Sequence, residues 1–374
     1  MRRACFHQAR RCLGLPALLL SLPLFLTPVC AETVRLGAIL PLTGPAARIG
    51  AGQMRALQGA VREANARGAA PGHRIEIVFE DSAAKPGQAI AAFRMLTRAP
   101  RVEVIFVSYS GPALALAPLA ARDRVLLVNA GAQADRLAVA SPYLINTIPA
   151  VGEEMAVLSR HLRARGQTRA AILYENTAAG LSGRDAFAEV FAKAGGTIVA
   201  QAEHLFGEAN FTPALMRLAA AGPEVVVVSI TTGLPGFAAE HRRLGARFTV
   251  AGTGFFQDPA LLDSGAAEGF VWARSRGGAP STAPGVSRPE SGPLMDAASL
   301  RYQEAAHIVL SALKRLLMEG LPVTGQTTRD MIFRMRAERG MPPLPLRGSV
   351  VSASIDIVTM RDGAETIIEP GRSE

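Results

Sequence analysis

The chain is poor in cysteine, and the little it has lies at one end. Of its 374 residues only Cys5, Cys12 and Cys30 are cysteines. From Glu32 onward no disulfide, thiol nucleophile or cysteine-ligated metal is therefore available. That part of the chain must be stabilised by a hydrophobic core, and its length is enough for about two domains.

Lysine and aromatic residues are also scarce. Three of the forty basic residues are lysines, and aromatic side chains make up 5% of the sequence. The arginines occur singly or in pairs, with no longer run and no interleaved aromatics, so the net charge of +9 does not indicate a nucleic-acid surface. With 49% hydrophobic and 19% charged residues, the sequence is neither intrinsically disordered nor a coiled coil.

The first 31 residues have the pattern of an export signal. Arginines at positions 2, 3, 10 and 11 precede an apolar run from Leu13 to Val29, which contains three prolines and is a poor membrane span. We predict cleavage after Ala31 and an exported protein of net charge +5, because four basic residues and no acidic ones are removed. Lipid attachment at Cys30 is the alternative, although Thr27–Val29 matches a lipobox poorly.

Short apolar runs alternate with segments of helical spacing, which predicts repeated β–α units on parallel sheets. A first series has strands at 34–40, 75–80, 102–107 and 125–128 and helices at 52–66, 87–98 and 112–122. A second has strands at 170–174, 197–204, 225–230 and 249–251 and helices at 183–194, 213–221 and 236–244. The continuous run Val225–Val228 is typical of a central strand covered on both faces.

The chain continues beyond these two series. A stretch rich in Gly, Pro, Ser and Thr at 276–293 indicates a loop, and a helix is expected over 296–318. Strand-like runs at 349–357 and 366–368 follow. Ligands of open α/β sheets bind beyond the carboxyl ends of the strands, so the loops that follow the strands are the place to search for a site.

Motifs that carry catalysis are incomplete. No lysine follows a glycine-rich turn as a P-loop requires, and Arg55 stands where a dinucleotide fingerprint starting at Gly50 needs its third glycine. Ser182 lacks the glycine two residues later that a nucleophile elbow needs, and its position favours a helix N-cap. The histidines beyond residue 31 are dispersed. We therefore expect no catalytic residue, no metal site and no cofactor.

Several short segments together carry a resemblance to a known family. They are Leu36–Ala47 (LGAILPLTGPAA) with Gly50, Asn65–Gly68, Glu80–Ser82, Ser110–Pro112 with Ala117–Pro118, Val128–Ala130 and Tyr174–Asn176 with Gly180. In this order they resemble the type I periplasmic solute-binding proteins, specifically the leucine/isoleucine/valine-binding receptors of ABC importers, from about residue 33 to 360. The resemblance implies two Rossmann-like α/β lobes joined by a three-crossover hinge, with the ligand enclosed between them.

The resemblance also implies how the chain divides. Crossovers are expected near Pro149–Gly152, Arg274–Pro293 and Arg347–Val351. Lobe 1 then contains residues 32–150 and about 277–348, and lobe 2 contains 151–276 and about 349–374.

Polar ligand contacts are expected by alignment with the family. Ser110 aligns with a serine that contacts the carboxylate of amino-acid ligands, although capping of the following helix explains it equally well. Gln133 stands where the family commonly has threonine or serine, and its amide can still donate and accept. Thr231 and Thr232 are further polar candidates, and Ala132 lies beside Gln133.

Three departures from the family change the expected ligand. Ile49 and Ala179 replace aromatics, and Gly254 falls where an acidic residue pairs with the ammonium group. A buried ammonium without a carboxylate partner costs several kcal/mol. Tyr109 and Phe255 remain as candidate apolar walls. These changes predict a weakly polar or apolar solute, either an aromatic acid or a lipid of sterol or hopanoid type.

The expected function is thus a receptor that traps a small solute by closure of the lobes and delivers it to an inner-membrane ABC permease with its ATPase subunits. A receptor for branched-chain or other amino acids or amides is one alternative. A ligand-sensing regulator on the same fold is another, and an enzyme using the cleft is a third. No nucleic-acid partner is expected.

Overall fold

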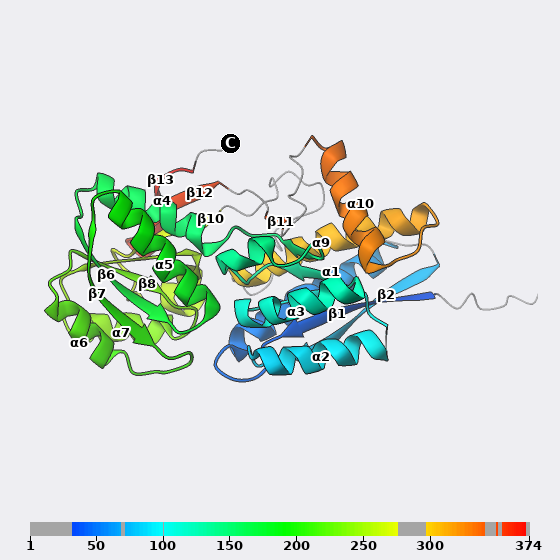
Figure 1. Ribbon diagram of the computed structural model, residues 1–374, viewed down its shortest axis with the longest axis horizontal. Coiled ribbons are helices and arrows are strands. Elements are labelled where there is room, and N and C mark those ends of the chain that lie inside the picture. Colours follow the sequence, from blue (N-terminus) through cyan, green and yellow to red (C-terminus); the bar gives the residue numbers. More distant parts are fainter. Residues whose placement is uncertain are drawn as a thin grey trace, which may run out of the picture.

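The computed structural model describes residues 32–68, 72–99, 101–275, 297–340, 349–350 and 354–371. They form two α/β lobes that lie side by side, with lobe 2 in green on the left of Figure 1 and lobe 1 in blue and cyan on the right. Within these ranges no helix is both long and apolar enough to cross a bilayer. The predicted export signal, its cleavage site and Cys30 lie outside the described residues.

Lobe 1 is built on a parallel sheet of six strands in the order β11-β5-β4-β3-β1-β2. The strands are β1 Glu32–Leu40, β2 His73–Asp81, β3 Val104–Val107, β4 Leu126–Asn129, β5 Leu144–Asn146 and β11 Ser349–Val350. Alternate residues of β3 face opposite sides, because side chains alternate along a strand. Phe106 packs toward α1 (Ala47–Ala66), α9 (Ala297–Met318) and α10 (Gly325–Glu338), and Ile105 toward α2 (Pro86–Arg98) and α3 (Ser110–Asp123).

Lobe 2 repeats this design on a sheet of seven strands in the order β13-β12-β10-β9-β8-β6-β7. The strands are β6 Arg169–Glu175, β7 Thr197–His204, β8 Val225–Ser229, β9 Thr249–Gly252, β10 Val271–Ser275, β12 Ile355–Arg361 and β13 Ala364–Glu369. Helices α4 (Val151–Ala164) and α5 (Ala178–Lys193) cover one face, and α6 (Thr212–Ala220) and α7 (Leu234–Arg243) cover the other. The Val225–Val228 run is a central, fully buried strand, as predicted.

Short helices and the final strands complete the two lobes. The 3₁₀ helices are η1 Asp135–Val139 and η2 Gly254–Gln257, and α8 spans Pro259–Leu262. β12 runs antiparallel to β10, and β13 antiparallel to β12. The chain passes from the first sheet to the second between β5 and α4, returns between β10 and α9, and passes again between β11 and β12. Most of the second predicted crossover, from residue 276, lies outside the described residues.

Two local expectations differ from the structure. The run predicted as one strand at 349–357 is divided, because Ser349–Val350 pairs with β5 in lobe 1 and only β12 joins lobe 2. The helix expected from residue 183 begins at Ala178, because Thr177 caps it by accepting a hydrogen bond from the Gly180 N–H at 3.1 Å. Ser182 is therefore inside α5, and its interpretation as an N-cap was wrong.

Candidate functional site

A pocket of about 340 Å³ lies between the lobes. Its walls come from segments that follow the carboxyl ends of the strands, where open α/β sheets bind their ligands. Lobe 1 contributes 108–112 after β3 and 130–131 after β4. Lobe 2 contributes 176–179 after β6, Thr231 after β8, and 254–255 and 257–259 after β9. The first turns of α9 add Ala297, Ala298 and Arg301.

The structure brings most of the predicted site residues to this pocket. Seven line it: Ile49, Tyr109, Ser110, Ala179, Thr231, Gly254 and Phe255. The other three, Ala132, Gln133 and Thr232, are buried beside it and do not line it. The Gln133 side chain donates to the carbonyl of Pro149 at 3.3 Å, so it holds the first crossover. The Ala132 N–H donates to Asn129 Oδ1 at 2.7 Å within a turn.

Ser110 has a structural task at the pocket. Its Oγ accepts hydrogen bonds from the Gln133 N–H at 3.2 Å and the Ala134 N–H at 3.1 Å, which fixes the loop after β4 against the start of α3. The residue before it, Tyr109, occupies the N-cap position and makes no capping bond with its side chain. The alternative that Ser110 caps α3 is therefore wrong.

Thr231 and Thr232 hold a buried carboxylate. Glu175 at the end of β6 is fully buried and accepts bonds from both threonine hydroxyls at 2.6 Å and from the Thr231 N–H at 3.2 Å. A buried charge needs such donors, so both hydroxyl protons are already used. The pKa of Tyr109 is raised, first by burial and then by the charge of Glu175, so its phenol stays neutral.

The side chains of Glu154 and Arg301 lie beside Gly254. The Gly254 N–H donates to Glu154 Oε2 at 3.0 Å. A Cβ at Gly254 would meet Arg301 Nη2 at 3.1 Å and Glu154 Oε1 at 3.4 Å. A side chain at position 254 would therefore have to displace the ends of Arg301, which comes from α9, and Glu154. Burial raises the pKa of Glu154, and the positive charge of Arg301 opposes that rise.

Two helices begin at the pocket, one from each lobe. Ser110 and Gly111 at the start of α3, and Thr177 to Ala179 at the start of α5, all line it. The first turn of a helix exposes N–H groups without intrahelical partners and carries partial positive charge. The surrounding wall is largely apolar and includes Ile49, Pro86, Phe206, Phe255 and Pro259. This arrangement suits an anionic group on an otherwise apolar molecule.

Several residues that line the pocket were not predicted from the sequence. They are chiefly Arg48, Gln53, Phe206, Asp258 and Arg301. Arg48 directly follows Leu36–Ala47, the first segment that carries the resemblance, so its position was a usable signal. Arg301 comes from a helix far along the chain, and no local spacing places it there. The buried Gln53 Oε1 has no hydrogen-bond partner among the described residues, so this wall retains unused accepting capacity.

Several contacts join the lobes around the pocket. Arg48 Nη2 lies 2.5 Å from Asp258 Oδ2. The rings of Tyr109 and Phe206 meet edge to face, with centroids 5.8 Å apart. Near the first crossover, the Asp135 N–H donates to Ser182 Oγ at 3.3 Å. The two lobes therefore stand in direct contact, in a closed arrangement. In the described ranges no group of three His, Cys, Asp or Glu residues could hold a metal ion.

Residues 33–334 match the family model described as periplasmic binding protein. The chain belongs to this family. Its curated relatives include the Leu/Ile/Val-binding protein homolog 3 of Brucella melitensis, 26% identical over 195 residues that cover 52% of this chain and 53% of the relative. Homolog 7 of Brucella abortus is 27% identical over 211 residues, 54% of this chain and 52% of the relative. The chain thus spans about half the length of these curated relatives.

Solved structures of periplasmic binding proteins share the whole fold. A solute-binding protein of an ABC transporter from Rhodopseudomonas palustris BisB5, in complex with 3,4-dihydroxybenzoic acid, has a TM-score of 0.76 at 24% identity and covers 91% of this chain and 97% of that one. A branched-chain amino acid ABC transporter protein from Thermus thermophilus with bound valine has a TM-score of 0.80 at 21% identity, with the same coverage. The predicted family and the two-lobe α/β fold are confirmed.

Proposed function

We propose that this periplasmic binding protein is the receptor of an ABC importer. It captures a small solute between its lobes and delivers it to an inner-membrane permease with its ATPase subunits. Membership of the family supports this proposal, and so does a pocket that both lobes line. Binding would favour the closed arrangement, because only there can a ligand contact both lobes at once.

The ligand we propose is a carboxylate-bearing, otherwise largely apolar molecule of the aromatic-acid class. The observation that carries this is the convergence of the first turns of α3 and α5 on an apolar pocket in which Arg301 stands beside Gly254. An α-amino acid also needs a carboxylate for its ammonium group. Glu154, the acid beside this place, already accepts from Gly254 and faces the charge of Arg301.

A sterol- or hopanoid-like lipid is the second candidate, because the apolar walls favour it. Such a ligand has few polar groups and leaves the N–H groups of the two helix N-termini without partners, which is costly in a closed pocket. Structures similar to this chain contain benzoate in one case and valine in another, so the fold accepts both kinds of solute. The choice must come from this chain's own pocket residues.

Thermal unfolding against a ligand panel tests the proposal. The panel contains benzoate, 4-hydroxybenzoate, 3,4-dihydroxybenzoate, leucine, valine and a sterol. An aromatic acid at a hundred times its Kd should stabilise the protein by about 2.7 kcal/mol. Stabilisation by leucine or valine with none by the aromatic acids would contradict the ligand class and leave the receptor function standing.

The receptor function itself needs a separate experiment. Pull-down of the ligand-loaded protein should recover an ABC permease, and uptake of the radiolabelled ligand should fail in a deletion strain. A ligand-sensing regulator would bind the same ligand without supporting uptake. An enzyme would convert the bound compound, which mass spectrometry of the incubated ligand would detect.

A further inference from the structure

A second hollow, of about 760 Å³, lies at the opposite end of the lobe 1 sheet from the interlobe pocket. It is placed at the amino ends of β3 and β4, between the end of α2 and the start of α10. Its charged lining residues are five arginines and two acids: Arg94, Arg98, Arg101, Arg122, Arg124, Glu103 and Asp123.

Both acids in this hollow are already engaged. Asp123 pairs with Arg122 at 2.7 Å. Glu103 Oε2 accepts from the Gly325 N–H at 3.1 Å, at the start of α10. The remaining four arginines, which we call the arginine edge, form no ion pair within the described part of the chain: Arg94, Arg98, Arg101 and Arg124.

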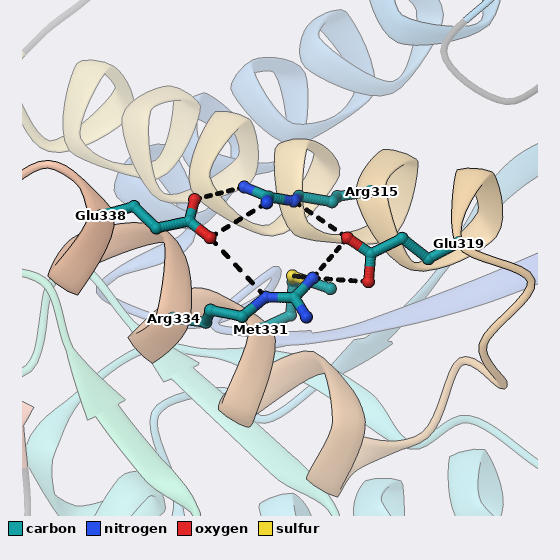
Figure 2. Close-up of polar contacts among 5 residues, drawn as sticks. All are labelled: Arg315, Glu319, Met331, Arg334 and Glu338. Atoms are coloured by element: carbon teal, nitrogen blue, oxygen red, sulfur yellow. Dashed lines mark hydrogen bonds and ion pairs between the residues drawn. The ribbon is translucent and has the colours of Figure 1, made fainter.

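The ion pairs between α9 and α10 show how arginines are neutralised in another part of lobe 1. Figure 2 shows two arginines and two glutamates of the α9–α10 region in a closed alternating ring. Arg315 on α9 contacts Glu319 at 3.1 Å and also Glu338, and Arg334 on α10 contacts Glu319 at 2.5 Å. The four arginines of the arginine edge have no acidic partners of this kind within the described residues.

Two residues of the arginine edge have an unusual backbone conformation. Arg101 and Arg124 have φ angles of 51° and 55°, in the left-handed region that side chains other than glycine and asparagine avoid. The corresponding helix-to-strand turns of lobe 2 all use glycine there, at 166, 195, 222 and 245. Arg101 and Arg124 thus occupy positions where the backbone conformation favours glycine. Both belong to helix-to-strand turns of lobe 1 that border the hollow.

The arginine edge lies at the end of lobe 1 where β1 begins. A neighbouring hollow of about 550 Å³ shares Arg101 and Glu103 with it and also includes Glu32, the first residue of β1. In a parallel sheet the amino ends of the strands lie on one side, so Glu32 is at the same end of lobe 1 as the edge. Lipid attachment at Cys30, the alternative to cleavage after Ala31, would place a membrane anchor two residues before Glu32.

We propose that the arginine edge binds the headgroups of anionic phospholipids and holds lobe 1 at the membrane surface. Guanidinium groups form paired hydrogen bonds to phosphate oxygens, and a broad open hollow admits headgroups without closing around them. Contact through this end leaves the interlobe pocket, at the other end of the sheet, accessible to solute. At low ionic strength each arginine near the surface strengthens binding about fivefold.

Vesicle co-sedimentation tests the proposal with protein purified after export. Vesicles contain phosphatidylcholine alone or with about a third phosphatidylglycerol, at about 0.01 M and 0.15 M salt. The edge variant carries Arg94→Gln, Arg98→Gln, Arg101→Asn and Arg124→Asn, because asparagine tolerates the left-handed backbone. The control variant removes the same charge from exposed arginines of lobe 2: Arg217→Gln, Arg242→Gln, Arg243→Gln and Arg247→Gln.

We expect the unaltered protein to bind the phosphatidylglycerol vesicles and not the neutral ones, more tightly at low salt. The edge variant should lose at least tenfold in affinity, and the control variant should keep most of it. Equal loss in both variants would mean that net charge alone acts, and would overturn the proposal. So would absence of binding by the unaltered protein, or stabilisation by millimolar inorganic phosphate without vesicle binding. None of these outcomes depends on the solute in the pocket.

Discussion

Arg48 of α1 and Asp258, which precedes α8, form an ion pair that joins lobe 1 to lobe 2 at the edge of the pocket, with Nη2 and Oδ2 2.5 Å apart. Asp258 also caps α8 by accepting from the Ala260 N–H at 2.9 Å. The carboxylate is thus fixed by its own lobe before it meets the arginine. The ion pair therefore helps to hold the two lobes together.

Arg48→Gln should weaken the closed arrangement. Because Arg48 is half exposed, the pair contributes about 0.2–1 kcal/mol, and we expect ligand affinity to fall up to about fivefold. The difference from the unaltered protein should shrink at high salt, and the radius of gyration from solution scattering should rise without ligand. Arg67→Gln is the control, because Arg67 pairs with Glu63 inside lobe 1. Equal effects of the two changes would contradict a role of the Arg48–Asp258 ion pair in holding the lobes together.

Gly207→Ala should obstruct closure by shape instead of charge. A Cβ at Gly207 in lobe 2 would lie 2.3 Å from Pro45 Cγ in lobe 1, and the φ of 81° adds backbone strain of about 1–2 kcal/mol. Gly222→Ala has comparable strain, with a φ of 59°, but meets no atom within 4 Å. Both variants should lose stability, and only Gly207→Ala should lose ligand affinity by calorimetric titration. Unchanged affinity in Gly207→Ala would show that the lobes close without this contact.

Arg301→Gln should make stability depend more strongly on pH. Burial raises the pKa of Glu154, and Arg301 opposes that rise. A carboxyl with a raised pKa in the folded state contributes stability below its unfolded pKa, and the contribution is lost as pH rises through the folded value. Removing the arginine raises that pKa further, so the free energy of unfolding should fall by about 1–2 kcal/mol near pH 8 and by less near pH 5.

Urea unfolding at both pH values measures this effect. The double variant Arg301→Gln with Glu154→Gln supplies the control, because it has no carboxyl to ionise at this place. Its loss of stability relative to Glu154→Gln alone should be the same at both pH values. A pH dependence that persists in the double variant would show that another group is responsible.

Thr232→Val should destabilise lobe 2 without altering the pocket wall. The change removes a 2.6 Å hydrogen bond to the buried carboxylate of Glu175 and should cost about 1–3 kcal/mol, measured by chemical unfolding. Thr231→Val should cost a similar amount and also change ligand affinity, because Thr231 lines the pocket. Thr197→Val, at an exposed position of β7, should have little effect. An unchanged free energy of unfolding in Thr232→Val would mean that Glu175 finds another donor.

Much of the fold was predictable because its strands leave little choice. The buried strands β3, β4 and β8 are unbroken apolar runs, which a sheet covered on both faces requires, and the helices between them have regular apolar spacing. The wrong prediction of where α5 begins came from two residues that could each cap the helix. Thr177 outcompetes Ser182 as a cap, so α5 starts five residues earlier than expected. Ser349–Val350 is too short for its partner to be deduced from pattern.

The candidate site was predictable only where it follows the strands directly. Ser110, Ala179 and Gly254 reach the pocket because each comes soon after a strand that ends at the cleft. Gln133 and Thr232 have the right chemistry and nearly the right position, but their side chains turn to Pro149 and Glu175. Arg301 was not predictable, because its place depends on how α9 packs after the chain has returned from lobe 2.

The insertion of β12 between β10 and β13 has a consequence for biosynthesis. The sheet of lobe 2 lacks two of its seven strands until residues 355–369 have been made, and Trp272 on β10 has no partner strand on that side before then. The chain therefore leaves the ribosome with its second lobe unfinished, and the native fold forms only after synthesis is nearly complete. Because this sheet is completed late, folding of lobe 2 is delayed, and a chain that is not yet folded can cross a membrane in extended form.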